Sequence, residues 1–226
     1  AAHTLFFFFL VILAGDAMLA KALHIVSSLG DARLTACVSE AVMRTAGGEM
    51  AEFAHLRDID MSQERYIEII TGKTAWMLRA SCELGALLSG APENLVQAAA
   101  TFGLELGVAF QMVDDALDFS PAKETGKPSG GDVREGKITP PLLLYIAALP
   151  QAEAARFKQR FRENTLDPAE LDAVSAAIYA DGHALRTREL AEGHLVSANS
   201  ALALLPETEA HAVLRQMALY IQSRDR

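Results

Sequence analysis

The stretch FQMVDDALDF, residues 110–119, decides how this chain is interpreted. It sets three carboxylates into an apolar run, and neither the stretch nor the fifteen residues before it contain Lys or Arg. Asp114 and Asp118 are four residues apart and therefore share a helix face, with Asp115 beside them and Gln111 one turn earlier. Burying unpaired carboxylates costs free energy, so we expect a cation there, and carboxylate oxygens suit Mg²⁺. From the spacing alone, a solvated acidic helix end remains the alternative.

A loop rich in Gly and Pro follows directly, GKPSGGDVREGKITPP, residues 126–141. Such a loop leaves backbone N–H groups free, and Lys127, Arg134 and Lys137 add donors for an anion. Its spacing nearly matches a phosphate-binding P-loop, but Ile138 stands at the Ser/Thr position and no strand-like segment precedes the loop. We therefore reject the P-loop. Next to the acidic helix, the loop predicts a diphosphate held between Mg²⁺ ions and lysines.

Together these two segments closely resemble the second aspartate-rich motif and following loop of the trans-isoprenyl (polyprenyl) diphosphate synthases. Further segments resemble that family in the same order, from about residue 14 to residue 141. They are Ala14-Gly15-Asp16, Gly48-Glu49, and Gly72-Lys73-Thr74-Ala75 with Tyr66 before it and Glu83-Leu84-Gly85-Ala86 after it. The resemblance implies an all-α, single-domain helical bundle of the isoprenoid synthase type over residues 1–226, with a central cavity.

The resemblance also implies a reaction and roles for its residues. In this family an allylic diphosphate ionises, the double bond of isopentenyl diphosphate attacks the carbocation, and a proton is lost. Mg²⁺ neutralises charge on the departing diphosphate, and lysines stabilise the same group. The implied metal ligands are Asp114, Asp115, Asp118 and Asp132, the diphosphate-binding residues are Lys73, Lys127 and Lys137, and the catalytic set is Lys73, Thr74 and Gln111. The alternative, purely structural roles are a surface helix lysine for Lys73, a helix-packing amide for Gln111 and turn capping for Asp132.

Composition and periodicity independently predict a single helical domain. Half of the 226 residues are hydrophobic and no alternating strand pattern of useful length occurs. The net charge of −9 argues against nucleic acid as a partner. Cys37 and Cys82 lack a framework spacing, which indicates reduced thiols and a cytoplasmic location. The predicted helices cover residues 5–29, 31–53, 62–89, 92–119, 138–148, 151–164, 168–179, 182–204 and 207–223, with N-caps at Asp31, Ser62 and Asp167 and stops at Gly30 and Gly90.

The N-terminal run Leu5–Ala14 is apolar over about ten residues, too short for a bilayer, so we expect no transmembrane segment and no signal peptide. It is expected to be a core or interface helix through which the chain forms a homodimer, as the resemblance also implies. The family carries a first aspartate-rich motif, DDxxD, upstream of the region where this chain begins, and no such pattern precedes Asp16. We therefore expect a C-terminal portion of a synthase that folds but is inactive or severely impaired.

Three functions are compatible with these patterns. The first is a prenyl diphosphate synthase, with a lean towards a long, octaprenyl-like product whose lipid nature would require delivery to a membrane. The second is a non-catalytic partner subunit of such a synthase, which has no physical need for the intact acidic set and lysines. The third is a terpene cyclase, whose usual Asn/Ser/Glu metal motif is not found beside Asp114. The first is preferred.

Overall fold

The computed structural model describes residues 2–121 and 129–224, with side chains from residue 9 onward. Helices dominate these ranges, which contain no β-strand, and the predicted all-α class is confirmed. The elements are α1 (Ala2–Ser28), α2 (Ala32–Ala54), α3 (Gln63–Ile70), the π-helical turn η1 (Thr71–Ala75), α4 (Trp76–Leu88), α5 (Glu93–Leu117), α7 (Gly131–Glu135), α8 (Pro140–Ala148), α9 (Gln151–Arg162), α10 (Pro168–Ala180), α11 (His183–Leu202) and α12 (Glu209–Ser223).

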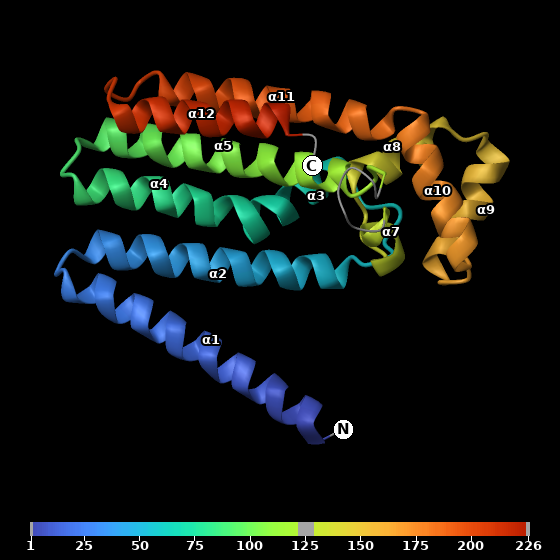
Figure 1. Ribbon diagram of the computed structural model, residues 1–226, viewed down its shortest axis with the longest axis horizontal. Helices are drawn as coiled ribbons and strands as arrows, with labels where there is room; N and C mark the ends of the chain where they lie inside the picture. The colour runs from blue at the N-terminus through green and yellow to red at the C-terminus, as the bar shows by residue number, and fades with distance from the viewer. Residues whose placement is uncertain (1, 122–128, 225–226) are drawn as a thin grey trace.

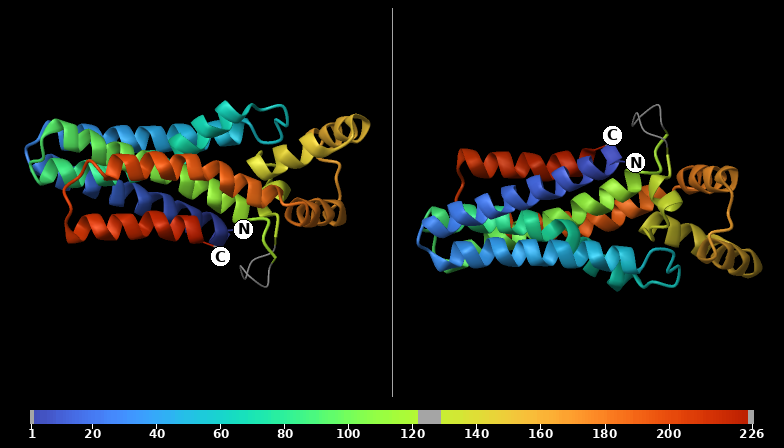
Figure 2. Two further views of the ribbon diagram at one scale, coloured as in Figure 1. Left: turned by 90° about the horizontal axis from the view of Figure 1, so that it is seen from above. Right: turned by 90° about the horizontal axis from the view of Figure 1, so that it is seen from below.

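Helices α2, α4, α5, α11 and α12 run along the longest axis of the molecule, while α9 and α10 form a hairpin at one end (Figure 1). The central helix is α5, which packs against α4 and α11. Views from above and below place α12 and α1 towards the same face (Figure 2). Helix α7 lies at the end nearest the α9–α10 hairpin.

Buried side chains form two main clusters along α5. The bundle core contains Phe102, Leu106 and Met112 of α5 together with side chains of α3, α11 and α12. The end core contains Phe119 and Val133 near the loop together with side chains of α8, α9 and α10. Because α5 contributes Val113 to the first and Ala116 to the second, Asp114 and Asp115 lie where the two cores meet.

Helix ends agree with the predicted caps. The side chains of Asp31, Ser62 and Asp167 accept the backbone N–H groups of Arg33, Arg65 and Glu170, and Asp167 completes a capping box. Gly30 and Gly90 have positive φ angles of 75° and 70°, the left-handed conformation that ends a helix. Two elements were not predicted: the short helix α7, and η1 within the segment predicted as one helix.

The turn η1 packs closely against both α2 and α5. A Cβ atom on Gly48 of α2 would lie 2.2 Å from the backbone nitrogen of Lys73, and one on Gly107 of α5 would lie 2.5 Å from the Cα atom of Ala75. Only glycine allows this contact between backbones. A π turn holds an extra residue, which changes the direction of the side chains it carries. Those side chains include Lys73 and Thr74.

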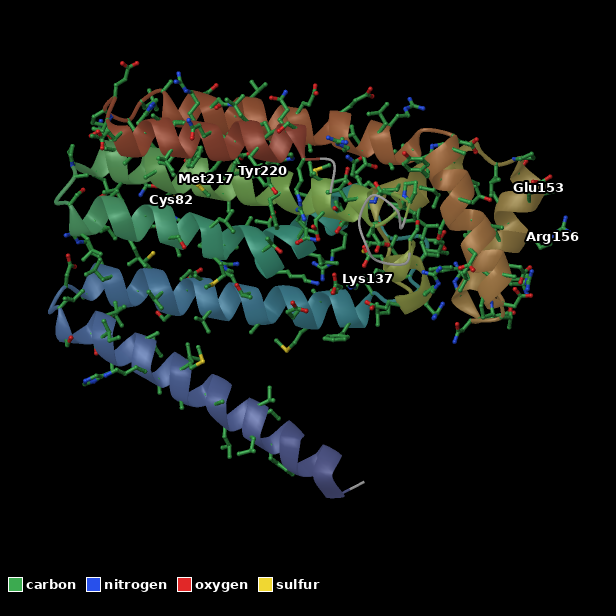
Figure 3. All side chains as sticks on the ribbon, in the orientation of Figure 1. Cys82, Lys137, Glu153, Arg156, Met217 and Tyr220 are labelled. Atoms are coloured by element: carbon green, nitrogen blue, oxygen red, sulfur yellow. The ribbon has the colours of Figure 1, made fainter. Side chains whose placement is uncertain are left out.

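Helix α1 diverges from α2 towards its N-terminus, and most of its described side chains project into solvent (Figures 1 and 3). Near its C-terminal end, Val26 packs against a small cluster around Leu34. By length and composition, two helical stretches could cross a membrane: Phe9–Ser28, with mean hydropathy 1.9, and the largely buried Glu93–Leu117. The judgement that the N-terminal run is too short was therefore wrong, because apolar helix continues well beyond Ala14.

Candidate functional site

A cavity of about 230 Å³ lies at the C-terminal end of α5, bounded by α2, α3, η1 and the loop from α7 to α8. Four carboxylates and two lysines line it: Glu52, Asp114, Asp115, Asp132, Lys73 and Lys137. Gln111 and Tyr66 complete much of the polar lining, with apolar side chains such as Ile69 and Ile70 between them. Six of the predicted residues therefore line one cavity, although they come from three separate segments.

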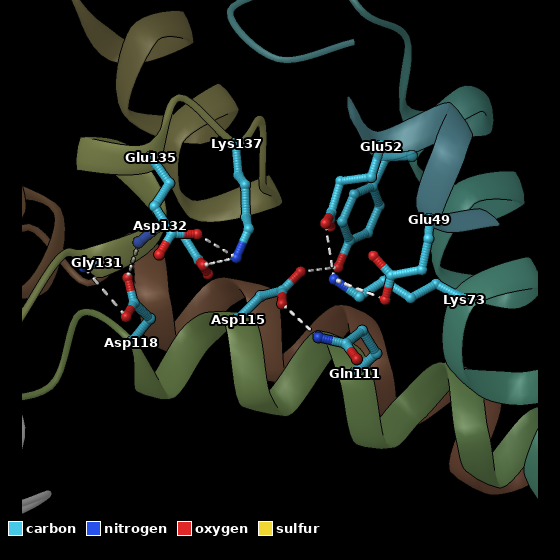
Figure 4. Close-up of polar contacts among 11 residues, drawn as sticks. Glu49, Glu52, Lys73, Gln111, Asp115, Asp118, Gly131, Asp132, Glu135 and Lys137 are labelled. Atoms are coloured by element: carbon cyan, nitrogen blue, oxygen red, sulfur yellow. Dashed lines mark hydrogen bonds and ion pairs between the residues drawn. The ribbon is translucent and has the colours of Figure 1, made fainter. Parts of the chain in front are cut away.

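A chain of hydrogen bonds links α3, α5 and η1. Figure 4 draws the part of it between Asp115 and Gln111. The hydroxyl of Tyr66 donates to Oδ2 of Asp115 over 2.6 Å, and Nε2 of Gln111 donates to Oδ1 over 2.8 Å. Oε1 of Gln111 in turn accepts the hydroxyl of Thr74 over 2.7 Å. Asp115 is buried, and two donors satisfy both of its oxygens.

Asp118 has a different environment. Its carboxylate accepts the backbone N–H groups of Gly131 over 3.2 Å and Asp132 over 2.9 Å, and so closes the loop onto the start of α7. Gly130, with a φ of 75°, makes the turn, and its N–H donates to the carbonyl of Asp118 over 2.7 Å. The structure thus gives Asp118 a loop-holding function and does not place it among the residues that line the cavity.

Both lysines in the cavity are already paired with carboxylates. Lys73 lies 2.7 Å from Glu52 and 3.8 Å from Glu49, and Lys137 lies 3.0 Å from Asp132 and 2.7 Å from Glu135. Figure 4 shows the two ammonium groups on opposite sides of Asp115. Hydrogen bonds to Glu135 and Asp132 outweigh burial and raise the pKa of Lys137. The remaining predicted lysine, Lys127, lies outside the described residues.

Asp114 is the most open of the helix carboxylates, with 47% of its side chain exposed. Its Oδ1 lies 2.9 Å from the guanidinium of Arg224, which follows α12 and also lies over the ring of Phe110 at 5.3 Å. Sequence reasoning missed Arg224 because no local spacing connects it to α5. It also missed the roles of Glu52 and Tyr66; for Tyr66 a signal existed, since residues 66 and 73 are two helical turns apart.

Negative charge is in excess in this cavity. Burial, and then the charge of Asp132, raise the pKa of Asp115 to about 7, although hydrogen bonds from Tyr66 and Gln111 oppose the shift. The same two causes raise the pKa of Asp118 to about 6, and burial raises that of Asp132. A cation bound beside these carboxylates would stabilise their ionised form.

The donor set fits a hard divalent cation such as Mg²⁺. Asp114 of α5 and Asp132 of α7 both offer oxygen ligands to the cavity, and Mg²⁺ requires few protein ligands because water and substrate complete its shell. The described residues contain no ready cluster of three or more ligands. The buried hydroxyl of Thr139, which also lines the cavity, has no hydrogen-bond partner among the described residues. A polar ligand in the cavity would supply one.

Comparison with known proteins identifies the fold family. The sequence profile of the polyprenyl synthetases matches residues 2–178. The chain belongs to the polyprenyl synthetase family. Component 2 of the heptaprenyl diphosphate synthase of Geobacillus stearothermophilus is 35% identical to this synthetase-family chain, and the alignment covers 93% of the chain and 65% of that protein. The octaprenyl diphosphate synthase of Escherichia coli is 32% identical, with 95% and 67% covered. The chain thus spans about two thirds of the length of these relatives.

Solved structures of polyprenyl synthases share the fold of this synthetase-family chain. The decaprenyl diphosphate synthase of Rhodobacter capsulatus matches with a TM-score of 0.87 and 32% identity, covering 95% of this chain and 66% of that one. A polyprenyl synthase of Caulobacter crescentus, solved with calcium and isoprenyl diphosphate, matches with a TM-score of 0.87 and 33% identity over the same shares. The predicted isoprenoid synthase bundle is confirmed.

Proposed function

We propose that the protein is a trans-polyprenyl diphosphate synthase, which condenses an allylic diphosphate with isopentenyl diphosphate. The observation that carries this proposal is the cavity at the end of α5, which two lysines and four carboxylates line together with Gln111. This arrangement suits a substrate with a highly charged diphosphate at one end and a reacting carbon beside it. The calcium and isoprenyl diphosphate of the Caulobacter relative support the same assignment.

The first step breaks the bond between the allylic carbon and oxygen, and the electron pair leaves with the diphosphate. Lys73 and Lys137 would donate hydrogen bonds to that diphosphate, from positions preorganised by Glu52 and Asp132. Thr139 would add its buried hydroxyl. A bound Mg²⁺, held by Asp114 and Asp132, would neutralise charge growing on the diphosphate oxygens.

The second step joins the two substrates. The π electrons of isopentenyl diphosphate form the new carbon–carbon bond, and a proton is then lost to restore a double bond. The oxygens of Gln111 and Thr74, bonded to each other over 2.7 Å, are the proposed neighbours of the cationic carbon. A long product, octaprenyl-like in length, is part of the proposal. The names of relatives that make octaprenyl and decaprenyl diphosphates support it.

A second candidate is a non-catalytic subunit of a two-component synthase. The Geobacillus relative, named as component 2 of a heptaprenyl diphosphate synthase, is the observation that favours a partner. We prefer a homodimer formed through α1, and a cytoplasmic location remains part of the proposal. The lysines and acidic residues of the cavity argue for catalysis. A subunit that binds no substrate would gain nothing from keeping carboxylates that repel one another so close together.

The function can be tested by binding and turnover together. An allylic thiolodiphosphate, whose sulfur bridge resists ionisation, should bind the chain by calorimetry with Mg²⁺ and not without it. Lys137→Ala should weaken binding by roughly 1.5–3 kcal/mol, the range for hydrogen bonds to charged groups. Lys158→Ala, which removes a partly exposed lysine paired with Asp60, is the matched control. Incorporation of labelled isopentenyl diphosphate into acid-labile lipid measures turnover. A chain that binds no analogue would overturn the proposal, whereas binding with little or no turnover is the outcome expected from the sequence.

A further inference from the structure

The buried Tyr66 has a contact that packing alone does not explain. Its side chain belongs to the bundle core, only 3% exposed, yet its hydroxyl donates to the carboxylate of Asp115, which is itself 6% exposed. A phenylalanine would fill the same space without burying a polar group. The hydroxyl therefore has a use at Asp115, on a helix 49 positions away in the sequence.

When Asp115 is ionised, its carboxylate can only accept hydrogen bonds, and the direction of each bond in the chain follows. Asp115 accepts from Tyr66 at one oxygen and from Gln111 at the other. Gln111 must therefore turn its NH₂ group to Asp115, which leaves its carbonyl oxygen facing Thr74. The only hydroxyl proton of Thr74 is used on that oxygen. What Gln111 and Thr74 can offer to a further partner is then lone pairs, not protons.

The reversed orientation of the Gln111 amide would present a proton, not lone pairs, to the substrate. If the Gln111 amide were turned over, its carbonyl oxygen would meet an oxygen of Asp115 at 2.8 Å, an unfavourable contact, and its NH₂ group would donate to Thr74. The Thr74 proton would then point outward. A donor aimed at a developing carbocation destabilises it, whereas an oxygen lone pair stabilises it.

We infer that Tyr66 is a positioning residue: through Asp115 it fixes the Gln111 amide so that Gln111 and Thr74 present oxygen lone pairs to the cationic carbon of the substrate. This inference rests on the proposed function, because it requires a cationic intermediate in this cavity. Without the Tyr66 hydroxyl, the carboxylate of Asp115 loses one of its two anchors and can rotate about its Cβ–Cγ bond. Gln111 then has no fixed acceptor to orient it.

The test compares two diphosphate analogues by calorimetry with Mg²⁺. One is an allylic analogue with a protonated amine in place of the cationic carbon. The other is the thiolodiphosphate, whose allylic carbon carries no positive charge. Tyr66→Phe should weaken the affinity for the amine analogue roughly tenfold or more, because an interaction with a charged group is lost. The affinity for the thiolodiphosphate should change less than about twofold. Tyr145→Phe is the matched control, because Tyr145 packs edge-on against Phe157 and His183, away from the cavity. It should change neither affinity.

A second measurement requires no ligand. The side-chain amide of Gln111, assigned by its loss in Gln111→Ala, should give hydrogen-bonded, slowly exchanging proton signals in nitrogen-15 NMR spectra. Tyr66→Phe should shift them and speed their exchange, while Tyr145→Phe leaves them unchanged. Equal weakening of both analogues, or amide signals that Tyr66→Phe does not move, would overturn the inference while leaving the proposed function intact. Wild-type protein that binds neither analogue would instead overturn the proposed function, and the inference with it.

Discussion

Arg224, the residue that follows α12, pairs with Asp114 across 110 positions of sequence, at 2.9 Å between guanidinium nitrogen and carboxylate oxygen. The end of the last helix thus lies over the most open carboxylate of the cavity. This pair joins the C-terminal segment to the side chain with the best access to an incoming cation.

Arg224→Ala should therefore tighten divalent metal binding to the ligand-free chain. The pair is partly exposed, and pairs of this kind are worth up to about 1 kcal/mol, so a gain of up to roughly fivefold in affinity is expected. Titration with Mn²⁺ followed by electron paramagnetic resonance measures it. Arg186→Ala, on α11, is the control. Weaker metal binding in Arg224→Ala would show that the arginine orients Asp114 for the metal rather than competing with it.

Gly48→Ala should destabilise the protein, whereas its neighbour provides a matched control. The added methyl of Gly48→Ala meets the backbone of Lys73 at 2.2 Å, so α2 and η1 must separate. Overpacking of this kind costs roughly 1–3 kcal/mol. Gly47→Ala meets no atom within 4 Å and should stabilise α2 by about 0.5–1 kcal/mol. Urea denaturation measures both, and equal effects of the two substitutions would contradict the contact.

Stability should depend on pH through Asp115. Its pKa is about 7 in the folded chain and near 3.8 when unfolded, so the folded state holds its proton more tightly. The stability it contributes is complete below about pH 4 and is lost as pH rises to 7. At about 1.4 kcal/mol per pKa unit, the free energy of unfolding should fall by up to roughly 4.5 kcal/mol over that window relative to Asp115→Asn. Mg²⁺ should flatten the dependence, and identical pH profiles of the two proteins would contradict it.

Self-association should depend on α1. Its exposed apolar side chains include Leu13 at 62% and Met18 at 74%, and a helix so exposed is expected to pack against a second copy. Sedimentation at micromolar concentration should give a dimer, which the double substitution Leu13→Glu and Met18→Glu disrupts. Leu204→Glu, equally exposed beyond α11, is the control. A wild-type protein that sediments as a monomer would contradict the dimer. So would a protein that binds lipid vesicles and does not self-associate.

Local signals in the sequence predicted the helices well, because caps such as Asp31 and Asp167 act over three residues. They predicted one helix from residue 62 to 89 because the π turn of η1 arises from contact with α2 and α5, not from its own residues. Spacing likewise treated Asp114, Asp115 and Asp118 as one ligand set. Tertiary contacts give each a different environment: Arg224 at the first, Tyr66 at the second and the N-terminus of α7 at the third. Their role as metal ligands remains a prediction.

The cavity lies where the bundle core and the end core meet, and this has a mechanical consequence. Lys73 is carried by η1, beside the bundle core, whereas Lys137 lies next to Ile138 of the end core. A diphosphate that binds both lysines would act as a non-covalent cross-link between the elements packed around the two cores. Binding should then couple the unfolding of the two cores into one cooperative transition, and its loss should let the α9–α10 end open first.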